Sequence, residues 1–524
     1  MHNLLRNLFI LWGVACFWLP CVTAEEIALY HTSDIHGYFF SRSDKNGQNY
    51  GGFAALESVL QAEERPFIIV DSGDFSSGNK EANASDGKLS IDLMNRAGKS
   101  PKNFKSQGYA ALTIGNHDSD FGDERLGKTL SHFSGDILSM NIKGFQIPNK
   151  TVKPYGFYEV GGKKLAFIGF SLDGPGMQGM QLKKVTPQSL ENLMKEVLAQ
   201  NPSAIIFLAH DSIGDSRKPS SFLPTLQGVK LAKENIDVIL GGHAHVLQNT
   251  KKLGEKGPLF VESGAMLEGT SRVIFDFDDK TGALNSVKAE YIRLDGKQDE
   301  ETAALLDEVE DKSLRQEFAT VPVLLPKYPA AGDSAPAVAR LVAEEMYQWV
   351  SPQEKIDMAM FQLPGIRRDL LPGTLTGRDI TELLPYTEYV STFDITGKHL
   401  KRAVEQSIKH DKNGDYSLFS YSENVKIAYK YNAKNEQNPV KITSFTIDGK
   451  KVKNKRVYRV AAIAHIPQGY FEGAPFKATN ANQKIYDPKT SGELLFDLVK
   501  KLDGATPQEK QLKAPAGVQI RKKN

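Results

Sequence analysis

The chain has 524 residues, with 65 Lys and Arg against 63 Asp and Glu, a formal net charge of +2 and 40% hydrophobic residues. The near balance of charge gives no electrostatic reason to expect a nucleic-acid partner, and the apolar content argues against a wholly disordered chain. Because domains usually contain about 100–200 residues, this length predicts more than one domain.

The N-terminal segment, residues 1–24, has the pattern of a secretory signal peptide. Arg6 precedes an apolar stretch from Leu8 to Leu19, and Val22–Ala24 supplies small residues for cleavage after about Ala24. A signal anchor is the alternative, but the apolar stretch is shorter than the ~20 residues that span a membrane.

Both cysteines, Cys16 and Cys21, lie inside this segment, so the mature chain would contain no disulfide. No later segment is apolar for long enough to cross a bilayer. We therefore expect a periplasmic or secreted protein without stable membrane insertion.

Residues 25–298 alternate short apolar stretches with helical stretches, which predicts an α/β domain with layered sheets and helices. The apolar stretches are Ile27–Tyr30, Phe67–Val70, Ala110–Ile114, Leu165–Ile168, Ala204–Leu208 and Ile236–Leu240.

Residues 299–328 begin with a charged, helix-prone stretch from Asp299 to Phe318. It predicts a helical linker between two domains, and an ordinary surface helix is the alternative. Residues 329–524 differ in pattern and predict a second, α+β domain. Its clearest elements are a helix over Val338–Val350 and strands over Val425–Tyr429, Ile442–Ile447 and Val457–Val460.

Five of the apolar stretches lead directly into loops rich in His, Asp and Asn. Six of the ten histidines beyond residue 24 lie in these loops. The carboxyl ends of strands in an open α/β sheet converge on one crevice, so the loops should meet. Imidazole and carboxylate ligands together suit zinc, manganese, iron or cobalt rather than calcium.

The spacing of the loop residues suggests two ions rather than one. Asp34 and His36 are two residues apart, as are His243 and His245, so each pair can face one side of an extended loop. The ligands suffice for two ions only if one carboxylate is shared, and Asp74 is the candidate bridge. Two neighbouring ions polarise a phosphoryl group and activate water for in-line attack.

The order of these motifs resembles that of the calcineurin-type metallophosphoesterases. The motifs are Asp34-x-His36, Gly73-Asp74, Gly115-Asn116-His117, His210 and Gly242-His243-x-His245. With the signal peptide and the second domain, the chain is similar to the 5′-nucleotidase family, which includes UDP-sugar hydrolases and 2′,3′-cyclic-nucleotide phosphodiesterases. The resemblance implies a four-layer metallophosphoesterase β-sandwich flanked by helices, a linker helix and a C-terminal α+β substrate-binding domain.

The resemblance also implies a role for each loop residue. One ion would be held by Asp34, His36, Asp74 and His245. The other would be held by Asp74, Asn116, His210 and His243. His117 would stabilise the transition state and Asp120 would orient it, forming a catalytic dyad. Asp118 stands where the family usually has Glu; it is expected to be a surface acid without a role.

In this family the C-terminal domain grips the nucleoside. Arg367 matches the family's arginine and would clamp a phosphate or carboxylate. Gln362 would also bind substrate. Tyr386 would stack on one face of a base, and Tyr470 or Phe471 would cover the other face of that base. Core packing is the alternative for each aromatic residue.

Three departures from the family pattern concern this domain. First, Gln362 replaces Asn and Leu363-Pro364 replace two glycines. Second, Glu388 adds negative charge where the family has Asn. Third, the Arg-containing stretch that often precedes the helix over Val338–Val350 is absent, and Lys327 is the only nearby base. The departures affect substrate recognition rather than the metal-binding loops.

The sequence therefore predicts a secreted phosphohydrolase with two divalent ions, zinc, manganese or cobalt being expected. Its substrate would be a nucleoside 5′-monophosphate, hydrolysed to nucleoside and phosphate. A UDP-sugar or a 2′,3′-cyclic nucleotide is the enzymatic alternative, and a binding protein without turnover is the alternative of another class. The expected partner is a small phosphoester rather than a nucleic-acid polymer, and no oligomeric state is predicted.

Overall fold

The computed structural model describes residues 25–523 except 45–46, 99–107, 173–176, 178–179, 214–221, 254–256, 329–332, 387, 412–413, 436–437, 470, 480, 504–511 and 513–518. The predicted signal peptide therefore lies outside the described residues. Among the helices described, none combines the length and apolar character that crossing a bilayer requires.

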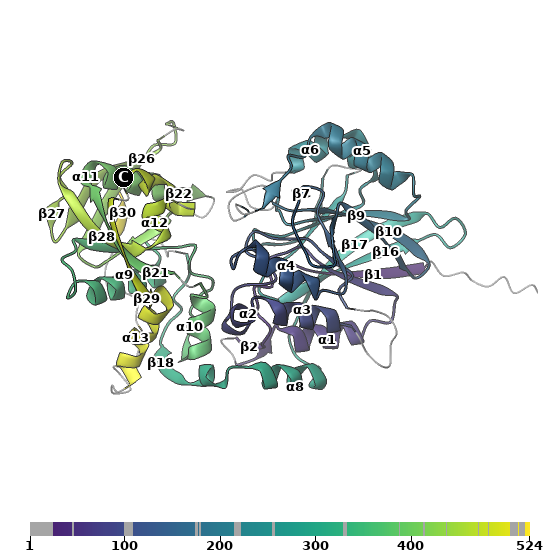
Figure 1. Ribbon diagram of the computed structural model, residues 1–524, viewed down its shortest axis with the longest axis horizontal. Coiled ribbons are helices and arrows are strands. Elements are labelled where there is room, and N and C mark those ends of the chain that lie inside the picture. Colours follow the sequence, from purple (N-terminus) through teal and green to yellow (C-terminus); the bar gives the residue numbers. More distant parts are fainter. Residues whose placement is uncertain are drawn as a thin grey trace, which may run out of the picture.

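The N-terminal domain is built on two facing sheets, one of seven strands and one of six (Figure 1). The larger sheet has the order β17 (Leu284–Arg293), β16 (Gly269–Phe277), β1 (Glu25–Thr32), β4 (Phe67–Asp71), β5 (Ala111–Leu112), β6 (Asp136–Leu138) and β8 (Val152–Lys153). The smaller sheet has the order β14 (Leu247–Lys252), β15 (Leu259–Ser263), β13 (Val238–Gly241), β12 (Ala204–Ala209), β10 (Lys163–Phe170) and β9 (Tyr155–Val160).

Helices cover the outer face of each sheet, which gives four layers and confirms the predicted architecture. The larger sheet packs on α1 (Phe53–Gln61), α3 (Lys88–Arg96) and α4 (Asp123–Ser131). The smaller sheet packs on α5 (Pro187–Leu198), α6 (Leu223–Gly228) and α7 (Lys230–Asn235). Strand β1 explains the continuous apolar stretches, because Ile27 and Leu29 pack between the sheets while Ala28 and Tyr30 pack under the helices.

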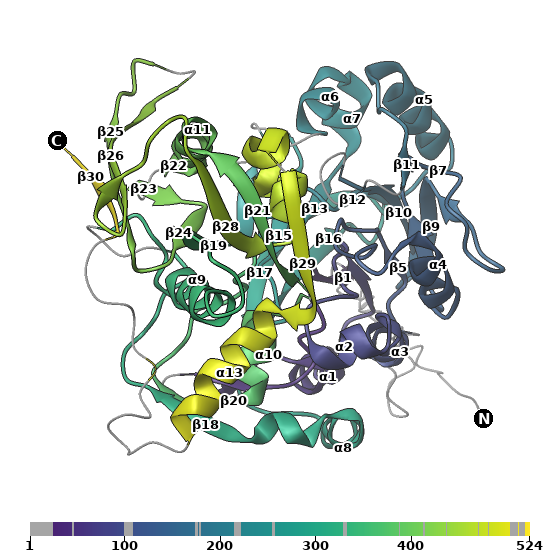
Figure 2. The same cartoon turned by 60° about the vertical axis from the view of Figure 1, so that its left-hand side comes forward.

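The segment between the domains is helical only in part, which corrects the expected helix over Asp299–Phe318. Helix α8 (Glu300–Val309) packs on α1 and ends where Glu310 becomes extended. A short 3₁₀ helix, η1 (Lys312–Arg315), follows, and then β18 (Glu317–Val321) pairs with β20 (Gly373–Thr376) of the C-terminal domain. Figures 1 and 2 both show α8 running beneath the N-terminal domain toward β18.

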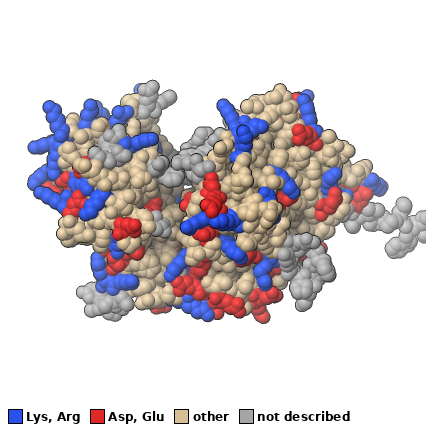
Figure 3. Space-filling model, viewed as in Figure 1, with Lys and Arg blue, Asp and Glu red and all other residues tan. Residues whose placement is uncertain are grey.

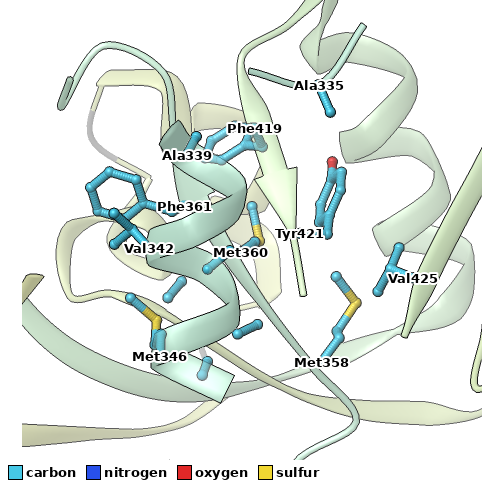
Figure 4. Close-up of a cluster of buried hydrophobic side chains, with 14 of the residues drawn as sticks. Ala335, Ala339, Val342, Met346, Met358, Met360, Phe361, Phe419, Tyr421 and Val425 are labelled. Atoms are coloured by element: carbon cyan, nitrogen blue, oxygen red, sulfur yellow. The ribbon is translucent and has the colours of Figure 1, made fainter. Parts of the chain in front are cut away.

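The C-terminal domain is α+β, as predicted. Its five-stranded sheet has the order β24 (Phe419–Tyr421), β19 (Met358–Gln362), β28 (Val457–Ile463), β21 (Tyr389–Thr396) and β29 (Ala481–Thr490). A four-stranded sheet has the order β27 (Lys450–Lys451), β26 (Val440–Ile447), β25 (Val425–Tyr431) and β30 (Ile520–Lys522). Helix α9 (Ala337–Val350) packs its buried face, including Val342 and Met346, against β19 and β24 in one core (Figure 4).

Candidate dinuclear metal site

The predicted metal ligands lie in loops that follow strands of both sheets. Strands β1, β4 and β5 of the larger sheet lead into three of these loops, and β12 and β13 of the smaller sheet lead into the other two. The structure brings together all seven predicted ligands: Asp34, His36, Asp74, Asn116, His210, His243 and His245.

Most of these ligands share an unusual backbone conformation. Positive φ angles occur at Asp34 (51°), His36 (51°), Asp74 (59°), His243 (76°) and His245 (58°). Residues other than Gly rarely adopt this conformation, and it concentrates at functional sites. Two backbone hydrogen bonds of 2.9 Å hold the first two loops in place, from Asp34 N–H to the Gly73 carbonyl and from His36 N–H to the Asp74 carbonyl.

The glycines of the second and third loops are required because these loops touch. A Cβ at Gly115 would lie 2.2 Å from Oδ1 of Asp74, and a Cβ at Gly73 would lie 2.6 Å from the backbone nitrogen of Gly115. Side chains at these positions would separate Asp74 from the loop that carries Asn116.

The first group of ligands consists of Asp34, His36 and His245. The Nε2 atoms of the two histidines lie 3.1 Å apart, and Nε2 of His245 lies 3.4 Å from Oδ1 of Asp34. Burial lowers the pKa of both histidines, and the nearby Arg367 guanidinium lowers it further. Both imidazoles are therefore neutral, which is the form that binds metal.

The second group consists of Asp74, His210 and His243, with Asn116 beside them. Nε2 of His210 lies 3.2 Å from Oδ2 of Asp74, and Oδ1 of Asn116 lies 2.8 Å from Nδ1 of His243. Burial alone would lower the pKa of His210, but the Asp74, Asp34 and Asp118 carboxylates raise it to about 10. The same negative field favours a bound cation.

Asp74 lies between the two groups, as expected of a bridging ligand. Its Oδ2 atom is 3.2 Å from Nε2 of His210 in one group and 3.7 Å from Nε2 of His36 in the other. This oxygen is fully buried and accepts no hydrogen bond from the described residues. A buried, unsatisfied carboxylate oxygen is costly, so the site fits cations that would coordinate it.

Backbone carbonyls orient two of the histidines. Nδ1 of His36 lies 3.0 Å from the Ser77 carbonyl oxygen, and Nδ1 of His210 lies 2.7 Å from the Ser72 carbonyl oxygen. A proton on Nδ1 satisfies each carbonyl, so in the neutral imidazole that binds metal the Nε2 lone pair faces the other ligands.

The predicted dyad of His117 and Asp120 lies beside the first group. Nδ1 of His117 is 3.0 Å from Oδ2 of Asp120, which also accepts a hydrogen bond from the Ser77 hydroxyl. Burial lowers the pKa of His117, but Asp120 and Asp74 outweigh this effect and raise the pKa. Asp120 therefore favours the charged imidazole, while Asn116, the preceding residue, faces His210 and His243.

Asp118 is buried, so the expectation of a surface acid without a role is wrong. Its carboxylate accepts backbone hydrogen bonds of 2.8–3.0 Å from four N–H groups, those of Asp74, Phe75, Ser76 and Gly115. The side chain thus ties the Asp74 loop to the Asn116 loop. One feature of the sequence pointed to this structural role: the position is acidic here, as Asp118, and is usually Glu in the family that the chain resembles.

Two predicted substrate-binding residues reach the site from the C-terminal domain. Nη2 of Arg367 lies 3.0 Å from Nε2 of His36 and 3.4 Å from Nε2 of His245. The Tyr386 ring stacks on the His117 ring, with centroids 5.4 Å apart, and the Arg367 guanidinium lies 5.5 Å from the Tyr386 ring centroid.

The other predicted substrate-binding residues are Gln362, Tyr470 and Phe471. Gln362 is buried; its Nε2 donates to Oε1 of Glu388 at 3.1 Å and its Oε1 lies 3.2 Å from Nε2 of His465. Tyr470 lies outside the described residues, and the side chain of Phe471 does too.

Contacts between the domains hold Tyr386 near the metal ligands. The Tyr38 hydroxyl donates to the Glu382 carbonyl at 2.6 Å, and Asn83 Nδ2 donates to the Pro385 carbonyl at 2.8 Å. Arg378, in α10 (Gly377–Leu383), pairs with Glu81 and Glu310 at 2.8 and 3.1 Å. The N-terminal domain, the linker and the C-terminal domain therefore meet at one half-buried arginine.

Comparison with known families agrees with this architecture. Residues 27–247 match the family model described as calcineurin-like phosphoesterase, and residues 327–478 match the model described as 5′-nucleotidase, C-terminal domain. Fold and site together define a metal-dependent phosphoester hydrolase. The chain combines both characteristic domains and belongs to the 5′-nucleotidase family, which confirms the resemblance drawn from its motifs.

Individual relatives are distant. The NAD 5′-nucleotidase of Haemophilus influenzae is 24% identical and aligns over 77% of each chain. The 5′-nucleotidase precursor of Thermus thermophilus has the same fold, with a TM-score of 0.76, 20% identity and coverage of 95% of this chain and 99% of its own. A Thermus thermophilus sulfate thiohydrolase also shares the fold, with a TM-score of 0.71, 16% identity and coverage of 95% and 97%.

Proposed function

We propose that this protein is an exported 5′-nucleotidase that hydrolyses nucleoside 5′-monophosphates to nucleoside and phosphate. The observation that carries the proposal is the position of Arg367 and Tyr386. Both come from the domain that this family uses for nucleosides, and both lie against residues of the metal site. A guanidinium next to the metal ligands suits a phosphate, and an aromatic ring beside it suits a base.

Two bound divalent ions would polarise the phosphoryl group and activate a water molecule. His117, whose charged form Asp120 favours, would donate a hydrogen bond to the phosphoryl oxygens as negative charge grows on them. Arg367 would neutralise part of that charge from the opposite domain. Manganese, cobalt and zinc suit the imidazole and carboxylate ligands.

A second candidate substrate is a UDP-sugar, favoured by the contact between Gln362 and Glu388. This amide–carboxylate pair replaces the family's two asparagines and adds a negative charge to the substrate-binding domain. A carboxylate favours leaving groups rich in hydrogen-bond donors, such as sugar hydroxyls. A 2′,3′-cyclic nucleotide and, by analogy with the Haemophilus relative, NAD complete the range of substrates to test.

The test is a substrate panel on purified protein with Mn²⁺, Co²⁺ or Zn²⁺ added in turn. We expect release of phosphate and nucleoside to be fastest with nucleoside 5′-monophosphates. Faster turnover of UDP-glucose or of a cyclic nucleotide would replace the proposed substrate with that alternative. No turnover of any member, including an aryl phosphate, would favour a binding protein. Cell fractionation with N-terminal sequencing tests export and cleavage after Ala24.

A further inference from the structure

The four-stranded sheet of the C-terminal domain is strongly basic. Strands β25, β26, β27 and β30 contain no acidic residue in their sequences. Their seven basic residues are Lys426, Lys430, Lys441, Lys450, Lys451, Arg521 and Lys522. The overall charge of +2 conceals this local excess.

The strand register places five of these cations on one face. Lys426 and Lys451 both pair with Thr446, Lys430 pairs with Lys441, and Arg521 pairs with Ala428. Paired residues point to the same side of a sheet. We call the group Lys426, Lys430, Lys441, Lys451 and Arg521 the outer basic face.

The opposite face of the sheet is apolar and packs on the core of the domain. Val425, Ile427 and Tyr429 alternate with the lysines of β25, and Ile520 alternates with Arg521; all four are buried. This alternation fixes the register, because a shift by one residue would bury the cations. The basic side chains are therefore held outward by the fold.

The outer basic face is open to solvent. All five side chains are exposed, and none forms an ion pair with an acidic residue in the described part of the chain. The nearest acids along the strands, Glu423 and Asp448, lie in the turns before β25 and after β26. Figure 3 shows blue side chains gathered at the end of the molecule where Figure 1 places β26 and β27, far from the N-terminal domain.

We propose that the outer basic face docks this protein on the surface of an anionic phospholipid bilayer. The cations form a two-dimensional array on strands about 4.8 Å apart, with same-face positions about 6.7 Å apart along each strand. Lys430 is therefore about 5 Å from its partner Lys441, and Arg521, opposite Ala428, is about 8 Å from both Lys426 and Lys430. Lys451 is two strands, about 10 Å, from Lys426. These spacings are within the Debye length of about 8–10 Å at moderate salt, so the charges act together. A planar array complements a planar negative surface, whereas a linear polyanion would contact only one stripe of it.

Docking through this face is peripheral and compatible with catalysis. The face carries Lys, Arg and Thr side chains rather than a large apolar patch, so the attraction is electrostatic and no segment needs to insert. The metal ligands and Arg367 lie where the two domains meet, whereas β26 and β27 lie at the far end of the C-terminal domain (Figure 1). The proposal does not depend on the identity of the substrate.

Co-sedimentation with vesicles tests the proposal on the whole purified protein. Vesicles of phosphatidylcholine alone are compared with an equimolar mixture of phosphatidylcholine and phosphatidylglycerol. We expect binding only to the anionic vesicles, and release when salt is raised from about 0.1 M to about 1 M, where the Debye length falls to about 3 Å. The double variant Lys426→Glu/Lys430→Glu should bind about tenfold or more weakly.

A matched variant controls for net charge. Lys183 and Lys184 are exposed in the N-terminal domain, so Lys183→Glu/Lys184→Glu changes the charge equally but should bind like the wild type. Hydrolysis of a soluble substrate should be the same in all three proteins, which shows that each is folded. Equal losses in both variants, no binding to anionic vesicles, or binding to duplex DNA without binding to vesicles would each overturn the proposal.

Discussion

Oδ2 of Asp118 accepts a 3.0 Å hydrogen bond from the backbone N–H of Asp74, the residue whose own carboxylate lies between the two groups of candidate metal ligands. The same oxygen accepts the N–H of Gly115, which precedes Asn116. One buried side chain thus fixes the distance between two ligand-bearing loops. Residues that hydrogen-bond to metal ligands or to their loops orient those ligands without coordinating the metal themselves.

Asp118→Asn should lower metal affinity by about 10–100-fold, the usual effect of losing a partner behind the ligands. The asparagine retains one acceptor but turns an amide donor toward backbone donors that need an acceptor. Titration with Co²⁺, followed by its absorption, measures the affinity. Glu124→Gln is the control, because Glu124 is exposed and pairs with Lys128 on α4. Unchanged affinity in Asp118→Asn would disprove the positioning role.

Asp74→Asn should remove activity and lower the metal content of the purified protein. The reason is the position of Oδ2 between His36 and His210, so that one substitution weakens both sites. Elemental analysis measures the metal content. Two ions retained with normal turnover would show that Asp74 does not bridge them.

His117→Ala should leave the metal content unchanged and reduce turnover by about 10²–10³, the cost of losing one preorganised hydrogen-bond donor. The structure separates the two functions, because His117 contacts Asp120 and Tyr386 while Asn116 faces the second group of ligands. Parallel metal analysis and kinetics decide between the roles. Loss of metal with the mutation would mean that His117 is a ligand.

The N-terminal fold was predictable because both faces of its central strands are buried. Such strands appear in the sequence as continuous apolar stretches. Because parallel strands all end at the same edge of a sheet, the polar loops that follow them lie close together. The burial of Asp118 was not predictable in the same way, because it depends on the contact of two loops separated by about forty residues. The outer basic face could not be predicted either, because a near-zero net charge does not indicate which strands pair and so which lysines share a face.

The linker differs from its predicted structure for another physical reason. Its charged pattern continues to Phe318, but the helix ends at Val309 because the next two acids serve contacts outside the helix. Glu310 pairs with Arg378 of the C-terminal domain, and the backbone N–H of Asp311 donates to Glu81. Contacts between the domains override the local helix propensity of these residues. A local sequence pattern carries no information about such contacts.

The stability of the N-terminal domain should depend on pH through Glu63. Burial alone would raise its pKa, but hydrogen bonds from Arg65 and Tyr30 lower it from 4.5 to about 2. A lowered folded-state pKa stabilises the protein above 4.5, and this stabilisation is lost as the pH falls from 4.5 toward 2. Glu63→Gln should therefore lower the free energy of unfolding by about 3 kcal/mol at neutral pH.

Urea denaturation of both proteins at several pH values measures this difference, which should shrink as the pH falls below about 4.5. Glu26→Gln is the matched control. Glu26 also pairs with Arg65, at 3.0 Å, but its side chain is 47% exposed, so its loss should cost at most about 1 kcal/mol. A constant difference between wild type and Glu63→Gln across the pH range would contradict the assignment.

Selectivity for nucleotides should depend on Tyr386. The candidate metal-binding loops would recognise a phosphoryl group that every candidate substrate carries, so discrimination would have to come from the C-terminal domain. The Tyr386 ring stacks on His117 and lies 5.5 Å from the Arg367 guanidinium, and we expect the rest of its surface to stack on a base. Tyr386→Ala should therefore weaken kcat/KM for a nucleoside 5′-monophosphate by about 1–3 kcal/mol.

The same change should leave hydrolysis of a small aryl phosphate nearly unaffected, because that substrate has no base to stack. Tyr386→Phe is the matched control: it keeps the ring and removes only the hydroxyl, which lies 3.5 Å from Nδ1 of His117. It should retain nucleotide hydrolysis if stacking is the source of the effect. Parallel kinetics on both substrates separate the possible roles. Equal losses on the nucleotide and the aryl phosphate in Tyr386→Ala would mean that the ring supports His117 rather than the base, and the nucleotide assignment would lose its main support in the C-terminal domain.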